Sequence, residues 1–502
     1  MAQHGRANPP PTPHTSDSAD STAAGNSRTS KAPAGAVPLW RQLNAVAQVL
    51  IAVRAGKSWT TAQLDIESAL RPGVQALSFA VLRHYGTALA LRAALASRTP
   101  SAAADALLCS VLALALVPGD DGAADNALVD DAAQAGSAGG ARYEVHTLVN
   151  QAVEAAKRNP ATYPQASFIN ACLRRFLRER EALLAVAQRQ PQAQWNHPAW
   201  WIQRLQREHP EQWQSILQAN AFSAPLTLRI NAKNSTLARY KSALEVMNIE
   251  AQEVADSGLQ LGHSAYVPGL PGYTEGWFSV QDAAAQMAAP LLLDALSLAQ
   301  TTSGKTLRVL DACAAPGGKT AHLLEYAASK SIAIELLALD IDAARCQRIE
   351  DNLQRLQLSA HIVVADAANP QAWWDGQPFD AILLDAPCTA SGIVRRHPDI
   401  RWLRRETDIS QLALQQRVLL DALWPMLKPE AVMLYCTCSV FKAEGQEQMQ
   451  TFVARHKDAV LLPSLGHLLP QRPLQPGTLP DNHLGGHDGF FYGLLRKNAS
   501  SL

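Results

Sequence analysis

The chain has 502 residues, which is too long for one hydrophobic core and predicts two to four domains. Its 44 basic and 44 acidic side chains cancel, so nucleic acid could be bound only through a local basic patch. No apolar run is long enough to span a bilayer, and the first residues lack the basic start and apolar core of a signal peptide. Seven cysteines, an odd number, predict free thiols in a reducing compartment and therefore a cytoplasmic protein without membrane contact.

The first third of the chain predicts a tail followed by a helical domain. Residues 1–38 are rich in Pro, Ser, Thr, Ala and Gly, and we expect them to be disordered. From Trp40 the apolar residues recur with helical periodicity, which predicts an all-α domain over 39–190. A Gly/Ala/Asp stretch with five aspartates at 117–141 predicts a flexible acidic insertion. Further helices are predicted at 61–70, 75–96, 101–116, 144–157 and 165–187.

Residues 191–290 differ from the helical domain and predict a small α+β module that binds RNA or links its neighbours. Two short helical stretches come first, and a strand at 226–231 follows. A helix at 236–247 and a last strand at 276–282 complete the module.

Strands and helices alternate regularly over 291–498, which predicts an α/β, Rossmann-like domain with helices on both faces of a parallel sheet. Strands are expected at 307–310, 335–339, 361–365, 379–384, 431–436 and 490–495, and helices at 319–329, 342–357, 409–427 and 444–456. Ligands of such sheets bind at the carboxyl ends of the strands. Side chains at those ends are Asp311, Asp340, Asp366, Asp385 and Cys438, and we expect them to gather at one edge.

The segment Asp-Ala-Cys-Ala-Ala-Pro-Gly-Gly-Lys-Thr (311–320) predicts a turn that lets a ligand approach the backbone at the start of a helix. A phosphate-binding P-loop would need glycine where Cys313 stands. A tight turn without a ligand is the alternative. For Asp340, hydrogen bonds to ribose hydroxyls and an N-cap for the next helix are equally good interpretations. Asp366 has a similar status and would suit an adenine amino group.

Two thiols follow strands that should be neighbours. Cys388 ends Asp385-Ala-Pro-Cys, and Cys438 lies within Thr-Cys-Ser. This pattern predicts thiol-assisted group transfer, specifically methylation of a carbon in a cytosine ring. A structural zinc site that also uses Cys436 is disfavoured because the usual paired spacings and a matched histidine are absent. Cys436 is expected in the packing, and the alternative of an inert buried thiol fits Cys109, Cys172 and Cys346.

Two arginine clusters predict contacts with RNA. The segment 393–405 follows Cys388 and holds five arginines with Trp402, which suits a nucleic-acid backbone and an unstacked base. A solvated charged loop is the alternative. The second cluster, at the end of the helical domain, consists of Arg174, Arg175, Arg178 and Arg180.

The motifs at 311–320, 385–388 and 437–439 together resemble those of the RNA cytosine-5 methyltransferases that use S-adenosylmethionine. The segment 395–405 and Asp-Gly-Phe-Phe-Tyr at 488–492 are similar to the bacterial 16S ribosomal RNA enzymes of that family. The region from about 40 to 190 resembles the NusB-like RNA-binding domain of those enzymes, and Ile169-Asn-Ala-Cys-Leu-Arg-Arg is similar to its last-helix signature. The tail and the acidic insertion depart from the pattern.

The resemblance implies formation of 5-methylcytosine in 16S ribosomal RNA, at cytosine 967, before assembly is complete and without DNA as a substrate. It implies that Asp340 binds the cofactor ribose, that Asp366 lies by the adenine and that Asp385 lies between cofactor and base. Cys438 would be the nucleophile, and Cys388 would help to release the product. The remaining cofactor-binding residues would be Cys313, Ala314, Ala315, Pro316, Gly317, Gly318 and Lys319.

The motifs do not encode the substrate, so methylation of transfer RNA or another RNA is an alternative. A non-catalytic RNA-binding or ribosome-assembly factor is a third hypothesis. It is disfavoured because a protein that only binds RNA needs neither thiol.

Overall fold

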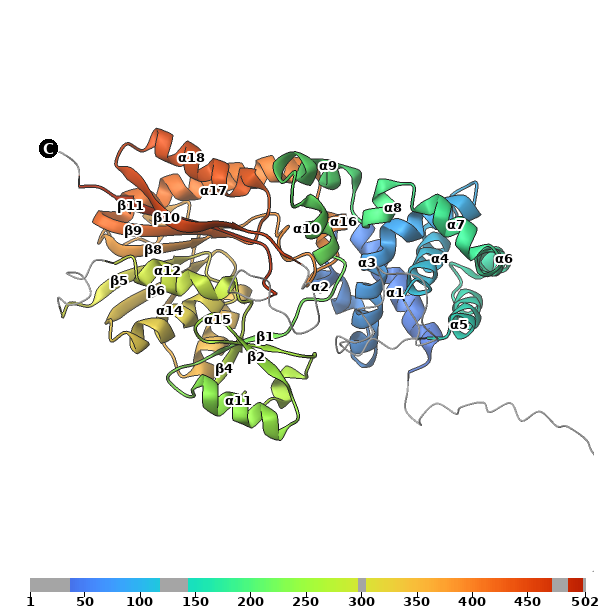
Figure 1. Ribbon diagram of the computed structural model, residues 1–502, viewed down its shortest axis with the longest axis horizontal. Coiled ribbons are helices and arrows are strands. Elements are labelled where there is room, and N and C mark those ends of the chain that lie inside the picture. Colours follow the sequence, from blue (N-terminus) through green and yellow to red (C-terminus); the bar gives the residue numbers. More distant parts are fainter. Residues whose placement is uncertain (1–36, 118–142, 297–303, 472–485, 500–502) are drawn as a thin grey trace, which may run out of the picture. The chain divides into compact units, whose positions relative to one another are not determined.

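The computed structural model describes residues 37–117, 143–296, 304–471 and 486–499 (Figure 1). The predicted tail at 1–38 and the predicted acidic insertion at 117–141 lie outside the described residues except at their edges. In the part of the chain that is described, no helix is both long and apolar enough to cross a membrane.

The described residues between Leu39 and Ala219 form helices, as the blue to green ribbon in Figure 1 shows. Its α-helices are α1 (Leu39–Arg54), α2 (Trp59–Ala62), α3 (Arg71–Leu95), α4 (Ala102–Leu114), α5 (Val145–Arg158), α6 (Ala166–Arg178), α7 (Arg180–Ala187), α8 (Pro191–Trp195), α9 (Ala199–Glu208) and α10 (Trp213–Ala219). α4 is buried from Ala104 onward and packs against α1 and α3, which explains why its sequence is apolar on every face. The likeness of this region to NusB stays a prediction.

Two of the predicted helices differ from the structure. The predicted helix 61–70 consists of α2 and two 3₁₀ turns, because Ile66 is extended and Pro72 begins a new helix, α3. The predicted helix 165–187 is divided into α6 and α7 at Glu179, whose backbone leaves helical geometry.

A small antiparallel sheet follows, with strand order β2-β3-β1-β4. Its elements are β1 (Thr227–Ile230), α11 (Leu237–Val246), β2 (Ala251–Val254), β3 (Gly258–Leu261) and β4 (Phe278–Val280). Tyr240 and Leu244 of α11 pack on Leu228, Leu259 and Phe278 to form its core. Arg229, fully buried on β1, reaches out of this module and forms a 3.0 Å ion pair with Glu325 of the large domain.

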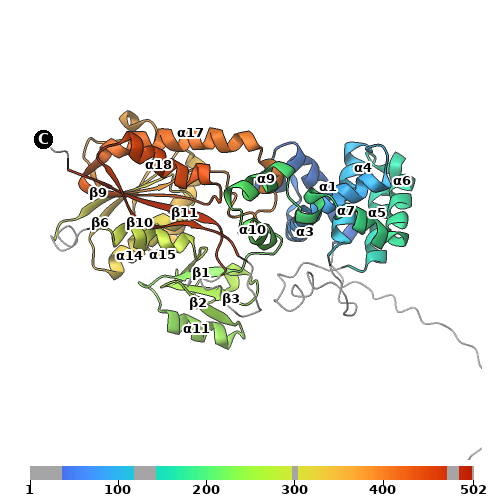
Figure 2. The ribbon, with the colours of Figure 1, turned by 45° about the horizontal axis from the view of Figure 1, so that its top comes forward.

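The large sheet has the order β10-β11-β9-β8-β5-β6-β7, and Figure 2 labels four of its strands, β6, β9, β10 and β11. Its strands are β5 (Leu307–Ala312), β6 (Ile334–Asp340), β7 (His361–Val364), β8 (Phe379–Asp385), β9 (Leu427–Thr437), β10 (Ala459–Leu468) and β11 (Phe490–Lys497). The prediction of a wholly parallel sheet is wrong, because β11 runs antiparallel to both β9 and β10. β10 itself was not predicted. Its Pro463, and a bulge between Leu462 and Gly466, interrupt the alternation that marks a strand.

Helices cover both faces of this sheet, as expected. They are α12 (Ala288–Leu293), α14 (Gly318–Ser329), α15 (Ala343–Leu356), α17 (Glu406–Leu423) and α18 (Gln446–Arg455), whereas the short helix α16 (Ile400–Leu403) contacts α1 of the helical region. Leu310 and Ile382 pack with α17 and α18, whereas their neighbours Val309 and Leu383 pack with α12 and α14. Burial on both faces explains why these strands are continuous apolar runs. It also leaves the carboxyl ends of the strands as the place for polar side chains.

Candidate active site

The two predicted thiols meet at the carboxyl ends of β8 and β9. These strands are parallel neighbours, with Asp385 paired in register with Cys436. Cys388 and Cys438 lie just beyond the strand ends, and their sulfur atoms are 3.4 Å apart. The hydrogen bond to Cys438, together with burial, raises the pKa of Cys388 well above its ordinary value. Cys388 therefore keeps its proton more firmly than an ordinary cysteine does.

Lys319 and Asp385 form a second pair beside the thiols. The Lys319 ammonium on α14 lies 2.7 Å from a carboxylate oxygen of Asp385. Burial alone would lower the pKa of Lys319, but Asp385 and the thiols of Cys436 and Cys438 raise it above its ordinary value. The other oxygen of Asp385 lies 3.5 Å from the sulfur of Cys436. Cys436 is thus buried, as predicted, and it also contacts the site.

Asp311 lies inside β5, not after it as the sequence predicted, and it is fully buried. One carboxylate oxygen accepts a hydrogen bond from the Thr320 hydroxyl at 2.6 Å. Its other oxygen, Oδ1, has no partner among the described residues. Burial raises the pKa of Asp311 to about 7, and the carboxylates of Asp385 and Asp340 act in the same direction. An unpaired carboxylate oxygen in this position suits a cationic group.

Asp340 is the last residue of β6, where it shapes the loop at 313–319. Its carboxylate accepts the backbone N–H of Ala315 at 3.1 Å. The N-cap interpretation is wrong for Asp340, because the cap of α15 is Asp342, which accepts the N–H of Arg345. Asp340 therefore holds the loop and also accepts the backbone N–H of the cap residue Asp342 at 3.2 Å, without being the cap itself.

Asp366 lies two residues beyond β7 and is exposed. It accepts the backbone N–H of Ala368 at 2.9 Å, which accounts for one of its oxygens. Two large apolar side chains are exposed at the same edge of the sheet, Ile341 at 66% and Val364 at 52%. An acidic group beside exposed apolar surface suits a planar aromatic ring that carries hydrogen-bond donors at its edge.

The loop at 313–319 has a backbone that most side chains would not permit. Cys313 has φ of 61° and Gly317 has φ of 92°. A Cβ atom at Gly317 would lie 3.1 Å from Ile349 on α15, so glycine is required by both conformation and space. Within the loop, Ala314 and Ala315 are buried, and Gly318 begins α14. The loop therefore brings its backbone close to the edge where Asp311 and Asp340 lie.

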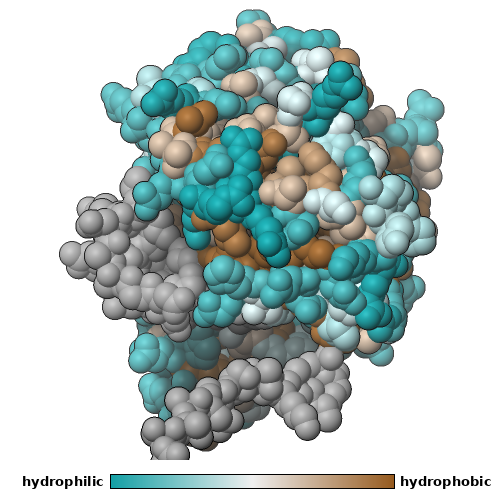
Figure 3. Space-filling model, turned by 90° about the vertical axis from the view of Figure 1, so that its right-hand side faces the viewer, coloured by the Kyte–Doolittle hydropathy of each residue, from teal (hydrophilic) through white to brown (hydrophobic). Residues whose placement is uncertain are grey.

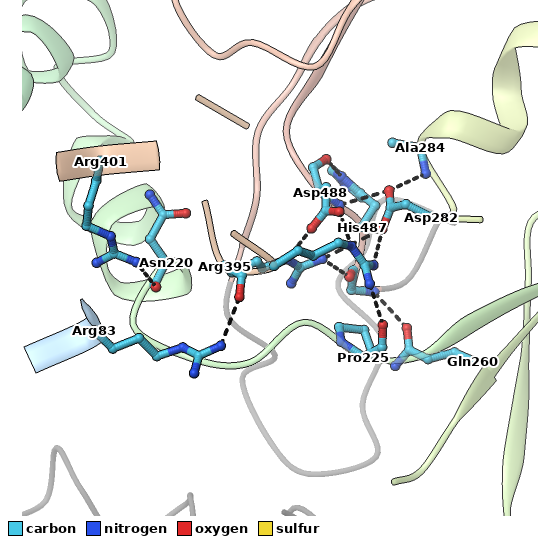
Figure 4. Close-up of polar contacts among 12 residues, drawn as sticks. Arg83, Asn220, Pro225, Gln260, Asp282, Ala284, Arg395, Arg401, His487 and Asp488 are labelled. Atoms are coloured by element: carbon cyan, nitrogen blue, oxygen red, sulfur yellow. Dashed lines mark hydrogen bonds and ion pairs between the residues drawn. The ribbon is translucent and has the colours of Figure 1, made fainter. Parts of the chain in front are cut away.

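The prediction that segment 393–405 contacts RNA is wrong for three of its arginines, which have partners within the chain. Arg395 is buried and lies 2.5 Å from Asp488 (Figure 4), and Arg396 forms ion pairs with both Asp488 and Asp282. Arg401 is fully buried and donates to the carbonyl of Asn220 at 2.7 Å. Their partners come from distant parts of the chain, which the sequence could not show.

The other residues of that segment also have intramolecular roles. Arg404 donates to the carbonyl of Thr389, next to Cys388, at 2.9 Å. The indole of Trp402 donates to the carbonyl of Leu82 on α3 at 2.8 Å. The segment therefore joins the helical region to the thiol loop, and Arg405 is its one exposed arginine.

The second arginine cluster, at the end of α6, remains at the surface. Arg174, Arg175 and Arg178 are exposed, whereas Arg180 donates to the carbonyl of Ala115. The face of the helical region shown in Figure 3 mixes hydrophilic and apolar side chains. Three of the four predicted arginines are consequently available to a phosphate backbone.

One acidic residue at the site was not predicted. Glu444 follows β9 and is fully buried, and its carboxylate contacts the residues next to both reactive thiols. Burial raises its pKa, against the effect of the hydrogen bonds it accepts. An acid six residues after a cysteine carries no signal in a single sequence. Within the described ranges no three His, Cys, Asp or Glu side chains are arranged to hold a metal, so the zinc alternative finds no support there.

Comparison with known proteins agrees with this geometry. Residues 298–496 match the family model described as 16S rRNA methyltransferase RsmB/F, and residues 197–267 match a ferredoxin-like domain of RsmF/B-like methyltransferases. Ribosomal RNA small subunit methyltransferase B of Vibrio cholerae is 42% identical over 362 residues, which are 71% of this chain and 78% of that protein. The chain belongs to the RsmB/F family of 16S rRNA methyltransferases. The resemblance seen in the motifs is thereby confirmed.

Further members of the family and one solved structure are also similar. The methyltransferase B of Pseudomonas putida is 41% identical and covers 72% of this chain and 80% of its own length. The crystal structure of PH0851 superimposes with a TM-score of 0.64 at 22% identity, over 92% of this chain and 99% of that one. That likeness shows the fold, in which a ferredoxin-like module precedes the large α/β domain.

Proposed function

We propose that this protein methylates C5 of a cytosine in 16S ribosomal RNA with S-adenosylmethionine as the methyl donor. The observation that carries the proposal is the 3.4 Å contact between Cys388 and Cys438 beside the Lys319–Asp385 ion pair. The family to which the chain belongs is described as acting on 16S rRNA, and the resemblance points to cytosine 967. The unassembled or partly assembled RNA is the expected form, because an unstacked base is needed.

The residues at the strand ends fit S-adenosylmethionine. The unpaired, buried oxygen of Asp311 suits the ammonium of its methionine part. The carboxylate of Asp340 suits ribose hydroxyls, and the apolar surface of Ile341 and Val364 beside Asp366 suits the adenine. When bound, the group supplies a methyl on a positively charged sulfur, which C5 takes as the sulfur–methyl bond breaks.

Cys438 would begin the reaction by adding its thiolate to C6 of the cytosine. The new sulfur–carbon bond takes the place of the C5–C6 double bond, so C5 becomes enamine-like and nucleophilic. The Cys388 thiol can donate a hydrogen bond to this thiolate, and Lys319 lies near enough to favour its charge. These contacts support Cys438 as the nucleophile, in agreement with the resemblance.

The Lys319–Asp385 pair would supply the proton that N3 takes as the thiolate adds. Asp385 alone was predicted as the donor, but its carboxylate lies 2.7 Å from the Lys319 ammonium, which carries protons that it can donate. We therefore assign the proton to the pair, with Lys319 as its source and Asp385 as the group that orients it. The proton returns to the pair when the adduct collapses, so the pair ends each cycle unchanged.

Cys388 would act in the second half of the reaction. Once Cys438 is bonded to C6 it carries no charge, so its contribution to the raised pKa of Cys388 is removed, while that of burial remains. Cys388 can then give its own proton to water and accept the proton from C5. The electron pair of that C5–H bond restores the double bond to C6 and expels the Cys438 thiolate.

The test is methyl transfer to 16S ribosomal RNA by single-cysteine variants, with bisulfite sequencing to locate the product. Cys438→Ala should abolish both turnover and the covalent RNA adduct. Cys388→Ala should abolish turnover and accumulate the adduct on a denaturing gel. Cys172→Ala, a buried thiol of the helical region, is the matched control and should retain turnover.

Other outcomes identify the alternatives. An adduct that persists in Cys438→Ala and disappears in Cys388→Ala would reverse the two roles. Methylation of transfer RNA in place of ribosomal RNA would change the substrate and keep the chemistry. RNA binding without methyl transfer by the wild-type protein would leave the assembly-factor hypothesis.

A further inference from the structure

Glu444 connects the two loops that carry the reactive thiols. One of its carboxylate oxygens accepts the backbone N–H of Thr389, the residue after Cys388, at 2.8 Å. The other oxygen accepts the hydroxyl of Thr389 at 2.5 Å and the hydroxyl of Ser439, the residue after Cys438, at 2.6 Å. A single side chain therefore holds the neighbour of each thiol.

Gln416 of α17 extends this connection to the other side of Cys388. Its amide N–H₂ donates to the Glu444 carboxylate at 3.2 Å and to the carbonyl of Pro387, the residue before Cys388, at 2.9 Å. The Tyr435 hydroxyl donates both to the Gln416 side chain and to the Glu444 carbonyl. The loop that bears Cys388 is thus fixed on both sides of the cysteine by groups that meet at Glu444.

The carboxylate of Glu444 is in an unusual environment for a charged group. It is fully buried, and in the described chain its partners are neutral donors, with no Lys or Arg in ion-pair contact. Burying a carboxylate without a cation costs free energy that neutral hydrogen bonds only partly offset. An apolar residue would suit a purely structural packing role better at such a site.

We propose that Glu444 is a positioning residue that sets the separation of the Cys388 and Cys438 sulfur atoms. The proposal rests on the function proposed above, in which both thiols act on the same cytosine. A carboxylate suits this task because its two oxygens accept four hydrogen bonds in fixed directions, three on the Cys388 side from Thr389 and Gln416 and one on the Cys438 side from Ser439. Removal of that bridge lets the loops move independently, and displacement of a reacting group by about 1 Å can cost about 100-fold in rate.

Turnover is the first measurement, with saturating RNA and cofactor. Glu444→Ala should lower kcat by about 100-fold and change either KM by less than about threefold, since Glu444 touches neither ligand. Glu444→Gln should recover most of the loss. Its amide oxygen can still accept the Thr389 N–H, and its N–H₂ can donate to the hydroxyls of Thr389 and Ser439, which are able to accept.

Capture of phenylarsine oxide is the second measurement and needs neither RNA nor cofactor. This reagent bridges two nearby thiols, releasing water as two As–S bonds form. The wild-type protein should take one equivalent, and Cys388→Ala should not retain it. Glu444→Ala should release the arsenical to a competing dithiol at a concentration about tenfold lower than the wild type requires, and Glu444→Gln should resemble the wild type.

Asp380 provides a matched control at the opposite end of β8. It is also a buried carboxylate, and it accepts the N–H of Arg308 at 2.9 Å and pairs with Lys428 at 2.7 Å. Asp380→Asn should lower the melting temperature without changing kcat or arsenical capture. If Glu444→Ala fails to fold, Thr389→Val and Ser439→Ala each remove one hydroxyl of the bridge and should shift both measurements in the same direction by less.

The proposal is overturned if folded Glu444→Ala keeps wild-type kcat and arsenical capture, or if the two hydroxyl variants leave both unchanged. Failure of the proposed function would look different. In that case Cys438→Ala would retain turnover, or the wild-type protein would show none, while the arsenical measurement would still report whether Glu444 sets the distance between the sulfur atoms.

Discussion

The arginine segment 393–405 and the acidic edge formed by Asp311, Asp340 and Asp385 use charge in opposite ways. Arg395 and Arg396 are neutralised by Asp488 and Asp282 of the same chain. At the acidic edge, a buried oxygen of Asp311 has no partner in the described chain. Charged side chains that form ion pairs within the chain stabilise the fold, whereas a buried carboxylate oxygen without a hydrogen-bond partner points to a ligand. The arginines of α6, exposed in solution, form a third case.

The largest expected effect on stability comes from removing an arginine that pairs with Asp488 and Asp282. Arg395→Ala removes one of the two arginines that neutralise the buried carboxylate of Asp488 and should cost about 3–5 kcal/mol of the free energy of unfolding. Urea unfolding followed by tryptophan fluorescence measures this loss. A variant as stable as the wild type, with weaker RNA binding, would restore the surface interpretation of this segment.

At the acidic edge, removing the charge of a buried side chain should stabilise the protein instead of destabilising it. An acid whose pKa is raised in the folded state is stabilising while protonated, and that stability is lost as pH rises from about 4 to about 7. The ligand-free protein should therefore lose up to about 1.4 kcal/mol per pH unit through this group in that window. Asp311→Asn should flatten the profile and be the more stable protein at pH 8.

The same substitution should weaken cofactor binding, which separates this prediction from one about stability alone. Ionised Asp311 is the form that attracts an ammonium, so affinity for S-adenosylmethionine should rise with pH through about 7 in the wild type. Calorimetry of both proteins at pH 6 and pH 8 measures this. Equal affinities at the two pH values would assign the unpaired oxygen to the fold instead of the cofactor.

Replacement of Asp340, at the same edge, should weaken cofactor binding by an intermediate amount of free energy. Asp340→Ala removes the group proposed to bind ribose hydroxyls and should weaken S-adenosylmethionine binding by roughly 1.5–3 kcal/mol. Part of the loss would come from the Ala315 N–H that Asp340 fixes. Asp342→Ala, which removes the true cap of α15, is the control and should lower the melting temperature with little change in affinity.

The smallest effect on stability is expected at α6. Replacing Arg174, Arg175 and Arg178 by Gln should change the free energy of unfolding by less than about 0.5 kcal/mol, because all three are exposed. RNA affinity should fall, and the slope of its logarithm against the logarithm of salt concentration should flatten by about 0.7–0.9 for each phosphate that the variant no longer neutralises. An unchanged slope would leave these arginines as ordinary surface charge.

These contrasts show which features could be predicted from the sequence. Helices and buried strands are recognisable by local periodicity, so β5, β6, β8 and β9 were placed within a few residues. The meeting of Cys388 and Cys438 followed from the rule that parallel strands end at one edge. Partners distant along the chain could not be predicted. Asp488 for Arg395 and Glu444 for Thr389 are neighbours only through tertiary packing, and β10 is recognisable only because β11 pairs with it.

The place of β11 in the large sheet affects how the protein is made. This strand pairs with β9, which ends beside Cys438, and with β10, and the segment before it supplies Asp488 to Arg395. Both thiols are therefore synthesised well before the strand that completes their support. When a nascent chain has just exposed Cys388 and Cys438, β11, which lies between β9 and β10, has not yet been synthesised. The large sheet can be completed only after residue 497 has been added. The edge proposed to be catalytic is among the last parts of this protein that translation allows to form.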